Sequence, residues 1–179
     1  MTDTRPAVIL PALALDYHAG TLTNTLTGEQ HTEVTGVPLA YREGRTLWPS
    51  PQNPDPRPEC VDGDRYGPCV DCGLKEFGPN GSPPPCSEEL TLLLWQDEGG
   101  QVVTLTARRT QVRTLEQYLG MKALLVGILH DQRVTLRMTP GDGLHRLTLL
   151  PGEMLDAGAQ GRMAGVAERV WAAGMWEGL

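Results

Sequence analysis

All four cysteines of the chain lie in one stretch, at a spacing of C-x8-C-x2-C-x13-C. They are Cys60, Cys69, Cys72 and Cys86. The stretch is entered through WPSPQNPDPRP at residues 48–58, whose prolines exclude a helix or a central strand. No single helix or strand can therefore bring the four thiols together, so we expect a bound metal to organise the loop.

Four thiolates are the ligand set of a closed, tetrahedral zinc site. We expect Cys69 and Cys72 to form the chelating pair, with Gly73 in the tight turn, and Cys60 and Cys86 to complete the site. One structural Zn²⁺ per chain is the prediction, with an iron–sulfur centre or a redox disulfide as alternatives. The N-terminus has no signal-like segment, and no apolar run approaches the roughly 18 residues that span a bilayer. We therefore expect a cytoplasmic protein without a membrane partner, where clustered cysteines are more typical of metal ligands than of disulfides.

A catalytic alternative comes from a short pattern. His31-Thr-Glu33 followed by Pro68-Cys69-Val-Asp-Cys72 matches the H-x-E…P-C-x-x-C signature of zinc deaminases, in which Glu33 would shuttle protons. The β-like surroundings of His31 argue against it, and it leaves Cys60 and Cys86 without a role. No HExxH, P-loop or GxSxG motif is present. We therefore expect a protein that is not an enzyme.

Hydrophobic patterning predicts a mainly β (α+β) fold. The expected strands are 21–27, a β-like stretch over 33–48 with a turn at Glu43-Gly44, the hairpin 90–95 and 101–107, and 145–150. Residues 123–138 are predicted as one long strand or as a hairpin turning at His130-Asp131. A helix should begin at Thr110 or Thr114 and end at Gly120, and a C-terminal helix should carry Met163, Val166, Val170 and Trp171 on helical spacing.

This order favours an OB-like small antiparallel barrel over residues 1–150, with the cysteine loop 60–86 inserted and one helix between strands. Residues 151–179 would form a C-terminal helical appendage. An open antiparallel sheet with helices on one face fits the same order.

Charge is distributed unevenly along the chain. The net charge is −7, yet residues 108–146 hold seven Lys/Arg and three Asp/Glu, which gives +4. Single-stranded DNA is bound by cations that contact phosphates and by rings that stack on bases. The candidate rings are Tyr41 and Trp48, and the candidate cations are Arg42, Arg45, Arg108, Arg109, Arg113, Arg133 and Arg137. We expect Trp95 to be a core residue, and Trp171 and Trp176 to form helix core or dimer contacts.

Taken in order, these features resemble a loosely defined group of phage- and prophage-encoded zinc-binding proteins of replication and recombination modules. The resemblance spans roughly residues 20–140. It is carried by TGE (27–29), GRTLW (44–48), the proline-flanked cysteines, LTLLLW (90–95) and VVTLTARRTQVRTLEQYL (102–119). It implies an OB-like core that binds single-stranded DNA.

Two functions follow as expectations. The first is a single-stranded-DNA-binding protein of DNA replication, recombination or repair. The second is a protein-interaction or regulatory module that acts on a polymerase or repair enzyme. In that case the acidic N-terminal half and the apolar C-terminal helix would be contact surfaces, and the same helix could support a homo-oligomer.

Overall fold

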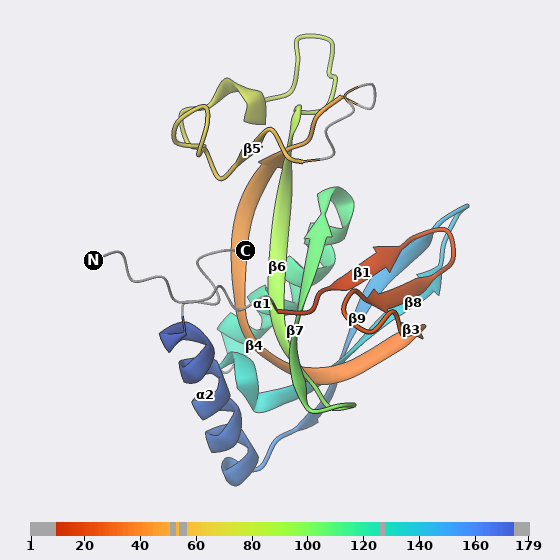
Figure 1. Cartoon of the computed structure of the whole chain (residues 1–179), viewed down its shortest axis with the longest axis vertical. Coiled ribbons are helices and arrows are strands. Elements are labelled where there is room, and N and C mark those ends of the chain that lie inside the picture. Colours follow the sequence, from red (N-terminus) through yellow and green to blue (C-terminus); the bar gives the residue numbers. More distant parts are fainter. Residues whose placement is uncertain (1–9, 51–52, 54–56, 126–127, 174–179) are drawn as a thin grey trace.

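A computed structural model describes residues 10–50, 53, 57–125 and 128–173. Antiparallel strands dominate, and two helices pack against them (Figure 1). The strands are β1 (Leu13–Asp16), β2 (Thr21–Asn24), β3 (Gln30–His31), β4 (Glu33–Leu47), β5 (Cys60–Val61), β6 (Cys86–Gln96), β7 (Gln101–Arg108), β8 (Gln132–Pro140) and β9 (His145–Met154). The helices are α1 (Val112–Leu125) and α2 (Ala157–Ala172), with 3-10 turns η1 (Gly73–Lys75), η2 (Arg109–Gln111) and η3 (Leu129–Asp131).

The long, curved strand β4 organises the main sheet. It pairs with β6 from Gly36 to Leu47 and with β8 from Glu33 to Gly36, which gives the order β7-β6-β4-β8-β9. A register shift between Pro38 and Ala40 interrupts the β4–β6 ladder, at the residue that has no backbone N–H to donate. Among the described residues β7 and β9 do not pair, so barrel closure is not found and the sheet is open.

An N-terminal three-stranded sheet, β1-β2-β3, lies between the two open edges (Figure 1). Ala12 forms a bridge with Thr104 of β7. On the other side, the backbone N–H of His145 in β9 donates to the Tyr17 carbonyl at 2.8 Å. These contacts satisfy backbone groups that the open edges would otherwise expose.

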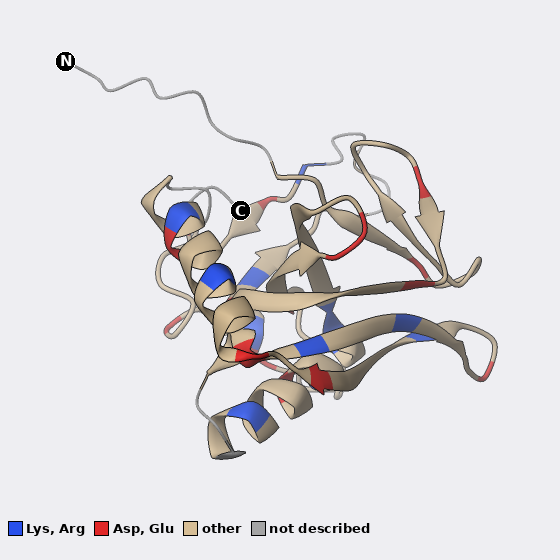
Figure 2. Cartoon of the chain, turned by 90° about the horizontal axis from the view of Figure 1, so that it is seen from below, with Lys and Arg blue, Asp and Glu red and all other residues tan. Residues whose placement is uncertain are grey.

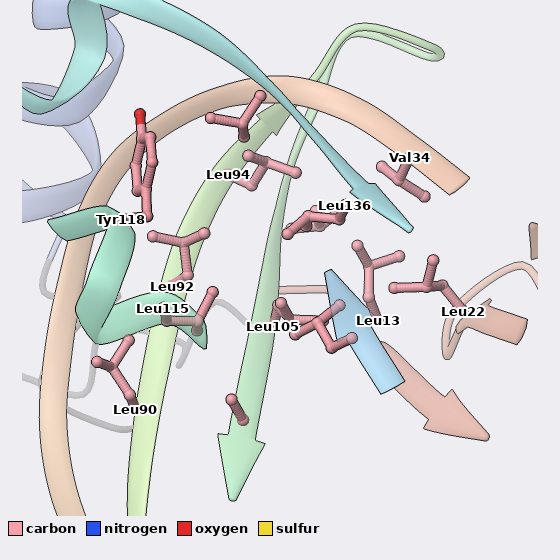
Figure 3. Close-up of a cluster of buried hydrophobic side chains, with 14 of the residues drawn as sticks. Leu13, Leu22, Val34, Leu90, Leu92, Leu94, Leu105, Leu115, Tyr118 and Leu136 are labelled. Carbon is pink, nitrogen blue, oxygen red and sulfur yellow. The ribbon is translucent and has the colours of Figure 1, made fainter. Parts of the chain in front are cut away.

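The main core lies on the inner face of the sheet, against α1 and the N-terminal sheet (Figure 3). Leu90, Leu92 and Leu94 alternate along β6 and are fully buried there. Leu105 of β7 and Leu115 of α1 pack in the same cluster. Burying each such leucine stabilises the fold by about 1.5–3 kcal/mol before entropy is counted.

A second cluster covers part of the outer face. Val166 and Val170 of α2 pack with Leu39 of β4 and Leu93 of β6, while Trp95 lies partly buried beside them. Strand β6 is therefore covered on both faces, which explains its continuous apolar run LTLLLW. The Asp156 carboxylate caps α2 by accepting from the Ala159 N–H at 2.7 Å.

Two expectations about the helices are wrong. Helix α1 passes through Gly120 and runs to Leu125, so residues 123–125 are helical and the strand begins only at Gln132. Lys122 points to the buried side of this extension and pairs with Asp131, which holds the helix against the start of β8. The Thr114 hydroxyl donates to the Leu147 carbonyl, a bond that joins α1 to β9.

Trp171 is 55% exposed, so it does not belong to the helix core, whereas the expected dimer contact stays a prediction. Trp176 lies outside the described residues. None of the helices in the described residues is long and apolar enough to cross a membrane.

Candidate nucleic-acid interface and cysteine cluster

The end of β4 brings two of the cysteines to the same level of the sheet. Leu47 pairs with Cys60 of β5 on one side and with Cys86 of β6 on the other. Residues paired across antiparallel strands point to the same face, so both thiols project to the side on which Leu47 lies. Cys60 and Cys86 are both buried there.

Cys69 and Cys72 come from the loop that folds over this point. The Cys72 N–H donates to the Cys69 carbonyl at 3.3 Å, which forms a tight turn between them. Gly63 starts the loop at φ +85°, and a Cβ there would lie 2.4 Å from the Gly67 carbonyl oxygen. No residue with a side chain fits this approach. All four cysteines line one small cavity, together with Leu47, Leu74 and Tyr66.

The four thiols are free and electrostatically coupled. Burial, reinforced by Asp62 and the neighbouring sulfurs, raises the pKa of Cys69. Burial and the Cys69 sulfur likewise raise the pKa of Cys86. Across the described residues, no three His, Cys, Asp or Glu side chains are arranged to hold a metal ion. The thiols therefore converge on one cavity without forming a coordination sphere.

The deaminase pattern is not assembled. His31 lies on β3, at the N-terminal sheet, and its ring is 4.0 Å from Glu98. Glu33 accepts hydrogen bonds from Arg137. Neither residue lines the cavity around Cys69 and Cys72.

The candidate DNA-binding residues divide between the two faces of the sheet. Arg42, Gly44 and Trp48 share the outer face, because they alternate along and just beyond β4. Gly44 is paired with Glu89, and Glu89 with Arg108, so Arg108 projects to the same face. The Arg108 guanidinium lies 4.3 Å from the centre of the Trp48 ring, a cation–π contact.

Arg109 joins this group. It has a φ of +52°, unusual for a residue with a side chain, and its Nε lies 3.5 Å from the Ser87 hydroxyl. Ser87 pairs with Thr46, which is on the outer face. We call Arg42, Trp48, Arg108 and Arg109 the outer-face cluster.

The other candidates lie elsewhere. Arg45 and Tyr41 are on the inner-face side of β4, and Arg45 lines the cysteine cavity. Arg113 is exposed on α1. Arg133 and Arg137 project from β8. The sequence segment 108–146 is therefore not one basic surface, and Lys122 within it is buried.

Most of the candidate cations are paired with carboxylates. Arg42 contacts Asp62 at 3.1 Å, Arg108 contacts Glu89 at 2.7 Å, and Arg45 contacts Glu88. Arg133 contacts Asp97 at 2.8 Å and Arg137 contacts Glu33. Basic and acidic segments accordingly alternate over the sheet in Figure 2. Exposed pairs of this kind are weak, typically below about 1 kcal/mol, so a phosphate can replace the carboxylate.

Sequence reasoning missed Asp62 and Glu89, the acidic partners of the outer-face cluster. The position of Glu89 could have been predicted from the sequence, because the hairpin register that pairs Gln96 with Gln101 also pairs Glu89 with Arg108. Asp62 carries no such signal, because it reaches Arg42 from the cysteine loop.

No protein-family model, curated protein or solved structure matches this chain.

Proposed function

We propose that the protein binds single-stranded DNA across the outer face of β4, β6 and β7. The observation that supports this most is the outer-face cluster: the Trp48 indole lies against the Arg108 guanidinium, and Arg42 and Arg109 are on the same face of the sheet, although these residues come from distant parts of the chain. Trp48 is 37% exposed and is stacked on one guanidinium. Its remaining ring surface can stack on a base while the arginines contact phosphates.

The connectivity supports an OB-like interpretation of the open sheet. Strands β4, β6 and β7 form a meander, α1 follows β7, and β8 returns to pair with β4. This order is compatible with that of an OB fold. In OB folds the second and third strands and the loop between the first and second bind oligonucleotides. Here these are β6, β7 and the connection that carries the cysteines, next to the outer-face cluster.

We also propose that Cys60, Cys69, Cys72 and Cys86 bind one structural Zn²⁺. The donor set supports this: four free thiols line one cavity. Burial and, to a smaller extent, nearby charges raise the pKa values of Cys69 and Cys86, and a divalent cation would stabilise their thiolates. A zinc ion would hold the connection between β4 and β6 in place and so fix its position beside Trp48. Four thiolates leave no ligand position for water, so the role is structural.

The proposal is tested by fluorescence anisotropy with labelled oligothymidine at 50 and 200 mM salt. Binding should weaken as salt rises, because phosphate contacts release counterions. Trp48→Ala should weaken binding by about 5- to 150-fold, the value of one stacked base, and Trp48→Phe should retain most of the affinity. Arg146→Gln is the control, since Arg146 is an exposed arginine on β9, outside the cluster.

The ion pairs allow a converse test. Glu89→Gln leaves Arg108 and Trp48 in place but removes the carboxylate that competes with phosphate. This variant should bind oligothymidine more tightly than the wild type. Wild-type protein that shows no binding at 50 mM salt, or equal affinity in Trp48→Ala, contradicts the proposal.

A protein-interaction module is the second candidate. The observation that favours it is the tip of the cysteine loop, where Tyr66, Val70 and Phe77 are all half or more exposed. A replication or repair protein could bury these side chains. Phe77→Ser should then abolish a stoichiometric complex with such a protein while leaving oligothymidine affinity unchanged. Loss of DNA affinity in this variant would instead assign Phe77 to the DNA-binding surface.

A further inference from the structure

A groove of about 510 Å³ runs between α2 and the end of the sheet, far along β6 from the outer-face cluster. The sheet contributes Trp95 and Arg133, and α2 contributes Arg162 and Arg169. The volume lies within the range of small-molecule sites, about 300–1,000 Å³. Its lining of three arginines, the Asp97 carboxylate and one indole separates it from an ordinary apolar helix–sheet seam.

The three arginines of the groove differ in their partners. Arg133 is held between the carboxylates of Asp97 and Glu153. The side chains of Arg162 and Arg169 form no hydrogen bond or ion pair with any described residue. The carboxylate of Asp156 lies near Arg162, because its Oδ1 and the Arg162 Nη1 lie 3.3 Å and 3.6 Å from the same Cβ position at Gly158. Arg162 and Arg169 are seven residues apart, hence two turns along the same side of α2. Two guanidinium groups without an ion pair thus border the groove, whereas Arg42, Arg45, Arg108, Arg133 and Arg137 are paired with carboxylates. Figure 2 shows both arginines of α2 as basic segments of that helix.

The glycines of α2 leave the space open. Gly161 and Gly165 both line the groove, and a Cβ at Gly161 would meet nothing within 4 Å. At Gly165 the nearest atom is the Arg169 guanidinium at 3.6 Å. Each glycine costs a helix interior about 1 kcal/mol relative to alanine. Close packing against the sheet does not account for them, whereas room for a ligand does.

We propose that this groove binds a nucleotide unit. Arg162 and Arg169 contact its phosphate through charge-assisted hydrogen bonds, and the base lies against the exposed parts of Trp95 and Met163. The unit comes either from a free nucleotide or from the phosphorylated end of a strand. The site is independent of the outer-face cluster, so either proposal can fail without the other.

The test is calorimetric titration of the full chain with dTMP, thymidine and inorganic phosphate. dTMP should bind at least about tenfold more tightly than either fragment, and Arg162→Gln/Arg169→Gln should weaken dTMP binding by at least about tenfold. Arg146→Gln and Trp48→Ala should bind dTMP like the wild type. Oligothymidine with and without a 5′-phosphate then distinguishes the source, because only a strand-end site prefers the phosphorylated form.

A blocking variant separates binding from folding. Gly161→Leu fills the groove yet improves helix propensity, so it should abolish dTMP binding with an unchanged or higher melting temperature. Failure of dTMP to bind at 10 mM overturns the proposal. So does equal affinity for inorganic phosphate, or dTMP binding that survives both the arginine double variant and Gly161→Leu.

Discussion

The cysteine loop and the β6–β7 hairpin are neighbours along the chain but are stabilised in different ways. The hairpin buries Leu92, Leu93 and Leu94 on alternating faces, under α1 on one side and α2 on the other. The loop, from Cys60 to Cys86, leaves Val70 and Phe77 more than 70% exposed. Burial therefore accounts for the order of the hairpin, whereas it does not account for the order of the loop.

From this difference we expect the loop, and not the sheet, to depend on the proposed metal ion. Backbone hydrogen bonds inside the loop are short-range, such as Asp71 N–H to Pro68 and Glu76 N–H to Gly73. Turns of this kind are marginal without further support. What the loop has in their place is the convergence of four thiols. We expect the loop to respond to metal removal, and the sheet to respond to changes in its packing.

The largest expected effect is on the loop. Cys69→Ser removes a ligand of the proposed zinc site, whose apparent binding free energy in zinc-finger peptides is about 10–16 kcal/mol. Native mass spectrometry should show one zinc ion per wild-type chain and none in the variant. Limited proteolysis should then cut the variant within residues 60–86, while the far-ultraviolet circular dichroism of the sheet persists.

Val70→Ser is the matched control, because it introduces the same side chain two residues before Cys72 without removing a thiol. It should retain the metal and the protease resistance. If the Cys69→Ser protein keeps its zinc, or if the wild type carries none, the loop does not depend on the proposed zinc site.

The second largest effect is expected for the buried ion pair between α1 and the turn before β8. Lys122 and Asp131 form an ion pair in which both side chains are at most 6% exposed. Asp131→Ala leaves a buried, unpaired ammonium group and should lower the free energy of unfolding by about 3–5 kcal/mol. Glu33→Ala, which breaks the exposed Arg137 pair, should cost less than about 1 kcal/mol. Urea denaturation measures the free energy of unfolding of both variants. Equal losses would contradict the burial of the Lys122–Asp131 pair.

Leu92→Ala tests the hairpin itself. The side chain is fully buried in the inner core, so truncation should cost about 2–5 kcal/mol by urea denaturation. Val70→Ala in the loop should change stability by no more than about 0.5 kcal/mol. Similar losses in both variants would mean that the loop and the sheet share one cooperative core and are not stabilised in different ways.

The same difference explains which features could be predicted from sequence. The hairpin and the C-terminal helix follow from local periodicity, and the structure contains both. The β-like stretch over 33–48 is also a strand, but β4 continues through Glu43 and Gly44, so the turn predicted there is wrong. The convergence of Cys60, Cys69, Cys72 and Cys86 was also predictable from their spacing, although the metal stays a prediction.

The features that were not predicted depend on contacts between different elements. Residues 123–125 have strand-like apolar character, yet they are helical because Lys122 finds its partner in Asp131 across the α1–β8 connection. Strand alternation alone predicts that Arg42 and Arg45 point to opposite faces of β4. Which of the two faces is exposed depends on where α2 packs, and the local sequence does not show this. The N-terminal sheet separates the edges of β7 and β9 through the contacts of Ala12 and Tyr17, and nothing local signals that placement.

The smallest expected effect concerns Tyr118, on the sheet side beside the buried pair. Burial, with a smaller contribution from the Asp131 charge, raises the pKa of the Tyr118 phenol to about 12. The folded protein thus holds this proton more tightly than the unfolded chain, whose tyrosines titrate near pH 10. The resulting stability is complete below about pH 10 and is lost as the pH rises to about 12, a change on the order of 1–2 kcal/mol once screening by solvent is included. Tyr118→Phe has no phenol to ionise and loses only a hydroxyl that bonds to no described residue. Urea denaturation at pH 9 and pH 11.5 should therefore show a smaller loss in the variant, whereas parallel losses would place Tyr118 in contact with solvent, like the residues of the loop.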